Sequence, residues 1–311
     1  MELLGIDIGG TKCAVVRGNE KGEVFAKEKF PTTTVEETLF NIFEAAKRLK
    51  GESVAVGISC GSPLDSEKGI IMSPPNLPGW DNIEIVKMVN EKLGLPAYLC
   101  NDANACALAE WRFGAGRGSK NMIFLTFGTG FGAGLILDGK LYNGTNGNAG
   151  EIGHVRLERF GPVGYGKQGS VEGFSSGGGI ALMAKTFAIE ALQRGEKPMY
   201  CKCLEELGSV SAKTVAEAAK AGDKTAIKVY ETTGEMLGRT LSILIDVLNP
   251  EKIVIGSIYQ RSSELMKDTM RKVIDSETLP MTNAVAEVVP AELGDELGDC
   301  AALALALECV K

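Results

Sequence analysis

The segment Asp7-Ile8-Gly9-Gly10-Thr11-Lys12 combines groups that suit a phosphate. Adjacent glycines leave backbone N–H groups open to close approach, and Thr11 and Lys12 add a hydroxyl donor and a cation. Asp7 ends an apolar run and is placed to hold Mg²⁺ through water, because Mg²⁺ takes few carboxylates directly. The spacing differs from that of a P-loop. A plain hairpin turn explains the same residues without a ligand.

A second glycine loop, Gly128-Thr129-Gly130-Phe131-Gly132-Ala133-Gly134, lies near the middle of the chain. Its GxGxG pattern does not indicate a dinucleotide site, because no helix with an acidic residue at the expected spacing follows. As a partner of the first loop, it suits a second phosphate contact through Thr129 and Gly130. On its own it is equally consistent with a tight turn in a sheet.

Asn101 and Asp102 lie in the segment 100–105, between a predicted strand and a predicted helix. An aspartate at this place is commonly a helix N-cap. The alternative is a general base, which must lie within hydrogen-bond reach of the hydroxyl that it deprotonates. The segment alone favours the N-cap.

Several loop residues suit the binding of sugar hydroxyls, because carboxylates, amides and imidazoles make directional hydrogen bonds. Glu151 and His154 are three residues apart, His154 is the only histidine, and Glu172 follows in a glycine-rich stretch. A lone histidine is also often structural. Asn76 lies in the proline-rich segment 73–80, which is alternatively explained as a surface loop with a buried tryptophan.

The pair Cys201 and Cys203 is the one close pair of cysteines in the sequence. A structural zinc site needs about four ligands, and no histidine or second cysteine pair is near. We therefore expect no metal at this pair.

The elements that must position these residues alternate between strands and helices, which predicts an α/β fold. Residues 139–179 are glycine-rich and are predicted to form a long functional loop. Strands are predicted at 3–8, 12–18, 24–30, 53–60, 97–102, 121–127, 133–138, 252–257 and 284–289. Helices are predicted at 35–49, 83–93, 103–113, 180–193, 211–220, 224–248, 262–276 and 296–310.

A faint internal repeat relates residues 3–16 to residues 123–137. Both segments consist of an apolar strand, a polar residue, a glycine turn and a second apolar strand, so that Asp7 corresponds to Thr126. Two such hairpins indicate a duplicated domain with a cleft between the copies.

Composition excludes several classes of protein. The 311 residues carry a formal net charge of −7, which argues against nucleic acid as a bulk partner. No run of about 18 apolar residues predicts a membrane span, and no basic segment precedes an apolar one at the start. The 8 cysteines lie mostly in apolar runs, which is typical of reduced thiols in a cytoplasmic protein.

Taken together, four segments in this order resemble the ROK family of repressors, uncharacterised reading frames and sugar kinases. The segment 6–12 is similar to the family's first phosphate loop, and 100–105 to its catalytic-base segment. Residues 128–154 are similar to the family signature over their whole length, and 253–257 to the adenosine-side strand and turn.

The resemblance implies an actin-like ATPase fold, with ATP and sugar between two α/β domains. We expect an N-terminal domain at 1–116, completed by a C-terminal helix at about 296–311, and a larger domain at 117–295. The implied activity is ATP-dependent phosphorylation of a hexose, with Mg²⁺ as cofactor and a homodimer or homotetramer as the assembly.

The resemblance also implies a role for each residue of the expected site. Asp102 is the general base and Asp7 the metal residue. The sugar contacts are Asn76, Asn101, Glu151, His154 and Glu172. The nucleotide contacts are Gly9, Gly10, Thr11, Lys12, Thr129, Gly130 and Gly256.

One departure from the family concerns its structural zinc. The family carries CxCGxxGCxE after the histidine, and counting back from Glu172 puts Val163, Tyr165 and Ser170 at the three cysteine positions. With three of four ligands lost, we predict no zinc, and we expect Tyr165 and its neighbours to shape the loop instead.

The family's repressors carry a helix-turn-helix ahead of the phosphate loop, whereas Asp7 stands almost at the start of this sequence. We therefore expect a kinase, with glucose as the first candidate substrate. N-acetylmannosamine, N-acetylglucosamine, fructose and allose stay open, as does a non-catalytic sugar sensor. The retention of Asp7, Lys12 and Asp102 argues against a sensor.

Overall fold

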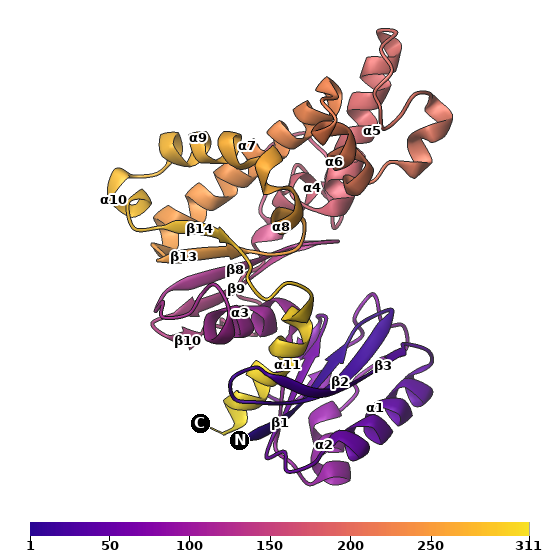
Figure 1. Ribbon diagram of the computed structural model, residues 1–311, viewed down its shortest axis with the longest axis vertical. Helices are drawn as coiled ribbons and strands as arrows, with labels where there is room; N and C mark the ends of the chain where they lie inside the picture. The colour runs from indigo at the N-terminus through magenta and orange to yellow at the C-terminus, as the bar shows by residue number, and fades with distance from the viewer. Residues whose placement is uncertain (311) are drawn as a thin grey trace. The chain divides into compact units, whose positions relative to one another are not determined.

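The computed structural model describes residues 1–310, and two five-stranded sheets dominate them (Figure 1). The first sheet has the order β3-β2-β1-β4-β7, with β1 (Glu2–Ile8), β2 (Lys12–Asn19), β3 (Val24–Pro31), β4 (Val56–Cys60) and β7 (Ala97–Asn101). The second has the order β10-β9-β8-β13-β14, with β8 (Met122–Phe127), β9 (Phe131–Leu137), β10 (Lys140–Leu141), β13 (Lys252–Ile255) and β14 (Glu287–Pro290). Two small hairpins add β5 (Leu64–Asp65) with β6 (Ile70–Ile71), and β11 (Val163–Gly164) with β12 (Lys167–Gln168).

The two large sheets share one plan. β1 pairs antiparallel with β2 and parallel with β4, while in the second sheet β9 pairs antiparallel with β10, and β13 parallel with β14. The hairpins β1–β2 and β8–β9 occupy corresponding places in the two strand orders. This agrees with the repeat read from the sequence, and the predicted α/β class is confirmed.

Helices flank the sheets, and short 3₁₀ turns connect several of them. Their ends follow ordinary capping chemistry: Thr34 accepts a hydrogen bond from the Glu37 N–H at the start of α1. The α-helices are α1 (Val35–Leu49), α2 (Ile85–Leu93), α3 (Asp102–Phe113), α4 (Val171–Phe174), α5 (Gly177–Gln193), α6 (Ala212–Lys220), α7 (Lys224–Leu248), α8 (Ile258–Ser262), α9 (Lys267–Glu277), α10 (Pro280–Asn283) and α11 (Leu297–Ala306). The 3₁₀ turns are η1 (Ile152–His154), η2 (Leu204–Ser209), η3 (Ser263–Leu265), η4 (Gly294–Glu296) and η5 (Leu307–Cys309).

The chain divides into two compact units. Unit 1 consists of Met1–Phe124, Gly134–Ala149 and the chain from Ala291 onward. Unit 2 consists of Leu125–Ala133 and Gly150–Pro290. Unit 1 is therefore assembled from three separate stretches of sequence.

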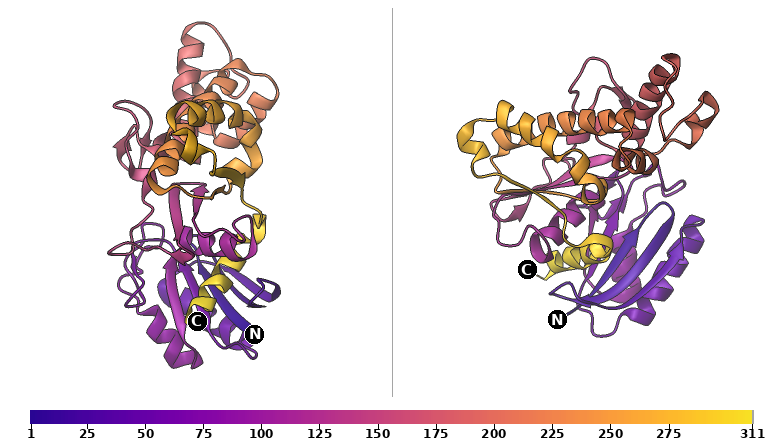
Figure 2. Two further views of the ribbon diagram at one scale, coloured as in Figure 1. Left: turned by 90° about the vertical axis from the view of Figure 1, so that its left-hand side faces the viewer. Right: turned by 45° about the horizontal axis from the view of Figure 1, so that its top comes forward.

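In unit 1, helices cover both faces of the first sheet. One face of β1 joins the larger apolar core with α1 and α2, and Leu4, Ile6 and Ile8 are fully or almost fully buried there. The other face packs against α11 (Figure 2). A Cβ added to Gly5 would lie 2.7 Å from the Ala302 Cβ, and one added to Gly57 only 2.0 Å from the Ala302 carbonyl oxygen. These glycines let the backbone of α11 lie directly on the sheet.

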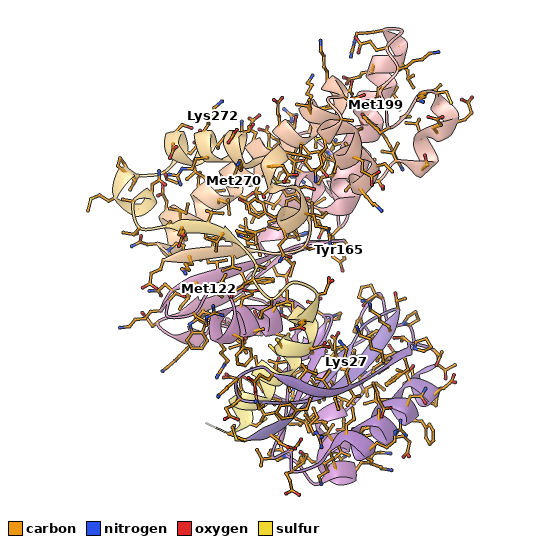
Figure 3. The ribbon with its side chains drawn as sticks, viewed as in Figure 1. Lys27, Met122, Tyr165, Met199, Met270 and Lys272 are labelled. Carbon is orange, nitrogen blue, oxygen red and sulfur yellow. The ribbon has the colours of Figure 1, made fainter. Side chains whose placement is uncertain are left out.

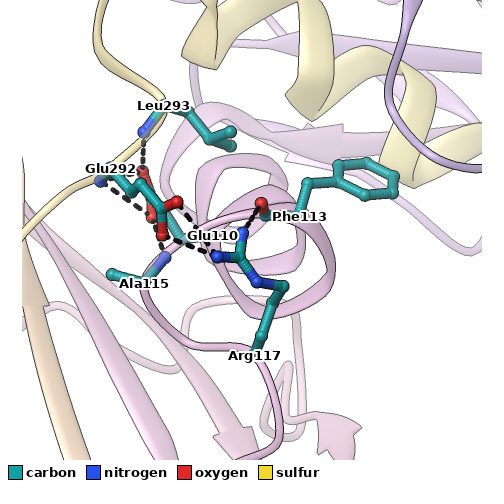
Figure 4. A network of polar contacts seen from close by, with 6 residues as sticks. All are labelled: Glu110, Phe113, Ala115, Arg117, Glu292 and Leu293. Atoms are coloured by element: carbon teal, nitrogen blue, oxygen red, sulfur yellow. Dashed lines mark hydrogen bonds and ion pairs between the residues drawn. The ribbon is translucent and has the colours of Figure 1, made fainter.

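A buried carboxylate fastens the segment that leads into α11. Glu110 of α3 is fully buried, and its oxygens accept hydrogen bonds from the N–H groups of Ala115, Glu292 and Leu293 at 2.8–3.0 Å (Figure 4). At the surface, Arg117 pairs with the Glu292 side chain at 3.0 Å. The buried carboxylate thus ties Ala115 to residues 292–293, and the exposed ion pair ties Arg117 to Glu292.

In unit 2, the long helix α7 packs against α5, α6 and α9. Its buried side is apolar, with Val229, Leu237 and Leu241 fully buried. No helix within residues 1–310 combines the length and the apolar character needed to cross a membrane.

Candidate functional site

The first glycine loop is the tip of the β1–β2 hairpin in unit 1. The Gly9 N–H donates to the Lys12 carbonyl at 3.2 Å, and a Cβ on Gly9 would lie 2.8 Å from that oxygen. Thr11 and Lys12 are exposed. The tip therefore needs glycine for its backbone path, and it presents a hydroxyl and an ammonium group to solvent, as a phosphate site requires.

Parallel pairing brings the ends of three strands to one edge of the first sheet. Ile8 of β1 is level with Cys60 of β4, and Cys60 is level with Asn101 of β7. Asp7 and the first residues of α3 consequently lie near each other, and the charge of Asp102 acts on Asp7. The carboxyl ends of strands in open α/β sheets are the usual place for ligands.

Asp7 is half-buried in a group of charges. The pKa of its carboxyl group is raised to about 6, chiefly by the loss of hydration and further by the negative charges of Asp102 and Asp299, with Lys27 and Lys12 opposing the shift. Lys27 of β3 (Figure 3) forms an ion pair with Asp299 in the first turn of α11. Keeping the Asp7 carboxylate ionised therefore costs free energy unless a cation lies beside it.

The environment of Asp7 fits a magnesium ion. No donor within residues 1–310 hydrogen-bonds to its carboxylate, and a Cβ on Gly298 would lie 3.3 Å from its Oδ2. A carboxylate without a donor partner, beside the exposed Thr11 and Lys12, is suited to a hydrated divalent cation.

The start of α3 separates the roles of Asn101 and Asp102. Asn101 is the N-cap, because its Oδ1 accepts the Asn104 N–H at 2.8 Å. Asp102 is the first helical residue, and its Oδ1 accepts the Ala103 N–H at 2.8 Å. The N-cap interpretation of Asp102 is therefore wrong. Asp102 is exposed, and the protein around it raises the pKa of its carboxyl group.

Asn76 lies against the first glycine loop. A Cβ on Gly10 would be 2.4 Å from the Asn76 carbonyl oxygen, and one on Gly61 would be 3.5 Å from its Oδ1. Trp80 of the same segment is 1% exposed and belongs to the core. Of the predicted site residues, unit 1 thus gathers Asp7, the segment 9–12, Asn76, Asn101 and Asp102.

Unit 2 contains a cavity of about 660 Å³ beside the second glycine loop. Gly128 and Thr129 line it, and the Gly177 N–H donates to the Gly128 carbonyl at 2.8 Å. Gly256 bonds through its N–H to Leu125 and does not line the cavity, whereas the next residue, Ser257, does.

Sequence reasoning missed most of this lining, which comes from helices rather than from motifs. Polar positions on an amphipathic helix look the same whether they face solvent or a ligand, so only Gly128, Thr129 and the glycine-rich stretch that contains Gly177 and Gly178 gave a signal. The further lining side chains include Ser211, Lys213, Glu217, Lys220, Tyr230 and Arg261.

The remaining predicted sugar contacts also lie in unit 2. Glu151 precedes η1, and His154 ends it. The His154 ring meets the Tyr165 ring edge-on, with 6.2 Å between centroids, and Tyr165 is well exposed (Figure 3). Glu172 lies in the first turn of α4, and its Oε2 accepts the Phe131 N–H at 3.1 Å.

A hydrogen-bonded hairpin occupies the place of the family's zinc cysteines. Ser170 caps α4 and donates to the Lys167 carbonyl at 3.0 Å, and Lys167 Nζ donates to the His154 carbonyl at 2.7 Å. Within residues 1–310, no group of three or more histidine, cysteine or acidic side chains is arranged to hold a metal. The absence of zinc stays a prediction.

Comparisons with known proteins cover nearly the whole chain. The ROK family model matches residues 3–309. The glucokinase of Halalkalibacterium halodurans is 33% identical over 307 residues, which is 95% of this chain and 92% of that protein. The structure of a ROK family glucokinase from Streptomyces griseus, in complex with glucose and AMPPNP, matches with a TM-score of 0.77, 30% identity and coverage of 99% and 100%. The DNA-binding transcriptional regulator NagC of Escherichia coli is 27% identical, over 93% of this chain and 71% of its own length.

Proposed function

Because the chain belongs to the ROK family and has the family's two-domain actin-like α/β fold, we propose that it is an ATP-dependent hexose kinase that acts on glucose. The observation that carries the proposal is the edge of the first sheet. There the exposed Asp102 at the end of β7 lies near Asp7 and the phosphate-suited hairpin tip. The similarity to glucokinases over almost the full length supports the choice of glucose.

In the proposed reaction, the Asp102 carboxylate takes the proton from a sugar hydroxyl. The sugar oxygen forms a bond to the γ-phosphorus of ATP while the bond between that phosphorus and the β,γ-bridging oxygen breaks, and ADP leaves. Asp7 would hold Mg²⁺, which offsets charge on the phosphate oxygens. Such a transfer needs mainly positioning and charge stabilisation, which the glycine tip and Lys12 are suited to supply.

The sugar contacts proposed are Asn76, Asn101, Glu151, His154 and Glu172. The proposed phosphate contacts are Gly9, Gly10, Thr11, Lys12, Thr129 and Gly130. The cavity beside Thr129 is large enough for a nucleoside, since small-molecule sites commonly measure about 300–1,000 Å³. Gly256 would act through the backbone that places Ser257.

The decisive experiment measures ADP release from ATP and Mg²⁺ with glucose, fructose, allose, N-acetylmannosamine and N-acetylglucosamine. We expect saturable turnover, with the highest kcat/KM for glucose. A higher kcat/KM for another sugar would change the proposed substrate but would still support a sugar kinase.

A non-catalytic sugar-responsive regulator is the second candidate, because NagC is also similar over most of this chain. No turnover with any sugar, together with sugar-induced thermal stabilisation, would favour it. The presence of Asp7, Lys12 and Asp102 favours the kinase.

A further inference from the structure

Glu172 is tied to the second glycine loop. Its Oε2 accepts the Phe131 N–H at 3.1 Å, and a Cβ added to Gly130 would lie only 2.9 Å from the same oxygen. No donor within residues 1–310 bonds to its other oxygen, Oε1. One carboxylate oxygen is thus used by the loop, and the other is available to a ligand.

The helix that carries Glu172 is held firmly. Ser170 caps α4 through the Gly173 N–H at 3.2 Å, and the Val171 N–H donates to the Val155 carbonyl at 2.9 Å. A Cβ on Gly164 would lie 2.9 Å from the Glu172 Cβ, so the β11–β12 hairpin packs directly against this residue. Glu172 is therefore a fixed point to which the glycine loop is attached.

The other end of the same loop borders the cavity. Gly128 and Thr129 line the cavity, and the Gly128 carbonyl accepts the Gly177 N–H at 2.8 Å. The turn is closed by the Gly128 N–H, which donates to the Gly130 carbonyl at 3.1 Å. A shift of the loop at Phe131 would therefore move the backbone that lines the cavity.

We propose that Glu172, besides offering Oε1 to the sugar, is a positioning residue that sets nucleotide affinity by holding the loop 128–131 through Oε2. The inference rests on the proposed kinase function, which assigns this loop to the nucleotide. Since sugar and loop share one carboxylate, the binding of sugar and the binding of nucleotide become coupled, and the coupling is the same in both directions.

Calorimetric titration with AMPPNP and Mg²⁺, with and without glucose, tests this without turnover. Glu172→Ala removes the acceptor, and we expect nucleotide affinity without sugar to fall about 10-fold, as for the loss of one hydrogen bond to a charged group. Glu172→Gln keeps a carbonyl oxygen for the Phe131 N–H, so nucleotide affinity should stay within about 3-fold while glucose affinity changes.

The control is Glu158→Gln, in the segment that precedes α4, because Glu158 forms an ion pair with Arg239 at 2.5 Å and does not line the cavity. It should leave both affinities and their coupling unchanged. If Glu172→Ala fails to fold, Glu172→Asp replaces it, since the shorter side chain keeps the charge but withdraws from Phe131.

The inference would be overturned if Glu172→Ala bound glucose more weakly but nucleotide as tightly as the wild type, because Glu172 would then be a sugar ligand only. The same criterion applies to Glu172→Asp where that variant replaces Glu172→Ala. Wild-type protein that binds no AMPPNP would contradict the proposed function itself and remove the inference with it. If the wild type binds AMPPNP and turns over glucose, and the Glu172 variant binds nucleotide equally well, the inference is overturned while the proposed function stays.

Discussion

Asp102 and Asn101 are adjacent residues with different tasks at the end of β7. Asn101 supplies the cap, so Asp102 is not needed to start α3. We therefore expect Asp102→Asn, which is nearly isosteric, to preserve the fold and sugar binding while kcat falls at least about 100-fold. Steady-state kinetics and calorimetry with glucose would measure the two effects. Turnover near that of the wild type would exclude Asp102 as the base.

The raised pKa of Asp102 gives a second prediction. The carboxylate accepts a proton only when ionised, and the loss of hydration that the surrounding protein causes raises its pKa above the ordinary 3.8. As the pH falls, kcat/KM for glucose should therefore decline at a pH above that value. The residual rate of Asp102→Asn should lack this acid limb. A pH–rate profile from pH 4.5 to 8 measures both, and an identical limb in the variant would assign the titration to another group.

At the scale of elements, the periodic helices and strands were predictable, because repeated apolar positions define one buried face. The glycine segments and Asp7 were also recognisable as suited to a phosphate from the residues alone.

Other features could not be predicted from the sequence. Asn101 and Asp102 are neighbours and can both form caps, so the sequence does not show which of them caps the helix. The predicted helix 262–276 is interrupted at η3, between α8 and α9. The elements within 139–179 are too short to show periodicity.

The β11–β12 hairpin provides a prediction about metal. Backbone and Ser170 hydrogen bonds hold the segment that thiolates would otherwise organise around zinc. Purified protein should contain less than about 0.1 zinc per chain, since a tetrahedral site needs about four ligands. Incubation with a strong chelator in the absence of nucleotide should leave the melting temperature unchanged. Stoichiometric zinc by elemental analysis would contradict this.

The Glu110 anchor yields a stability prediction for unit 1. Glu110→Gln replaces one acceptor oxygen with an NH₂ group facing buried N–H donors, so we expect a loss of about 3 kcal/mol in the free energy of unfolding. Glu292→Gln is the matched control, because it removes only the exposed pair with Arg117 and should cost less than about 1 kcal/mol. Urea denaturation measures both variants. Equal losses would mean that the buried carboxylate is not an anchor.

At the scale of the whole molecule, unit 1 depends on chain far from its beginning. Residues 301–306 of α11 are almost completely buried. Deletion of 296–311 should expose the glycine-lined face of the first sheet and abolish cooperative unfolding of unit 1, whereas deletion of 310–311 should not. Circular dichroism during heating compares the two truncations, and a stable, cooperative protein lacking 296–311 would refute this dependence.

The packing of α11 also affects how the protein is made. Because the first sheet ends with β7 at Asn101 and α11 begins at Leu297, a ribosome must still translate residues 102–296 after the sheet has been synthesised. At about 5–20 residues per second, this takes on the order of ten to forty seconds. During that interval the nascent sheet has Leu3, Val16 and Ala55 without the helix that covers them. Chaperones that bind apolar strands therefore have a defined period in which to act on this chain.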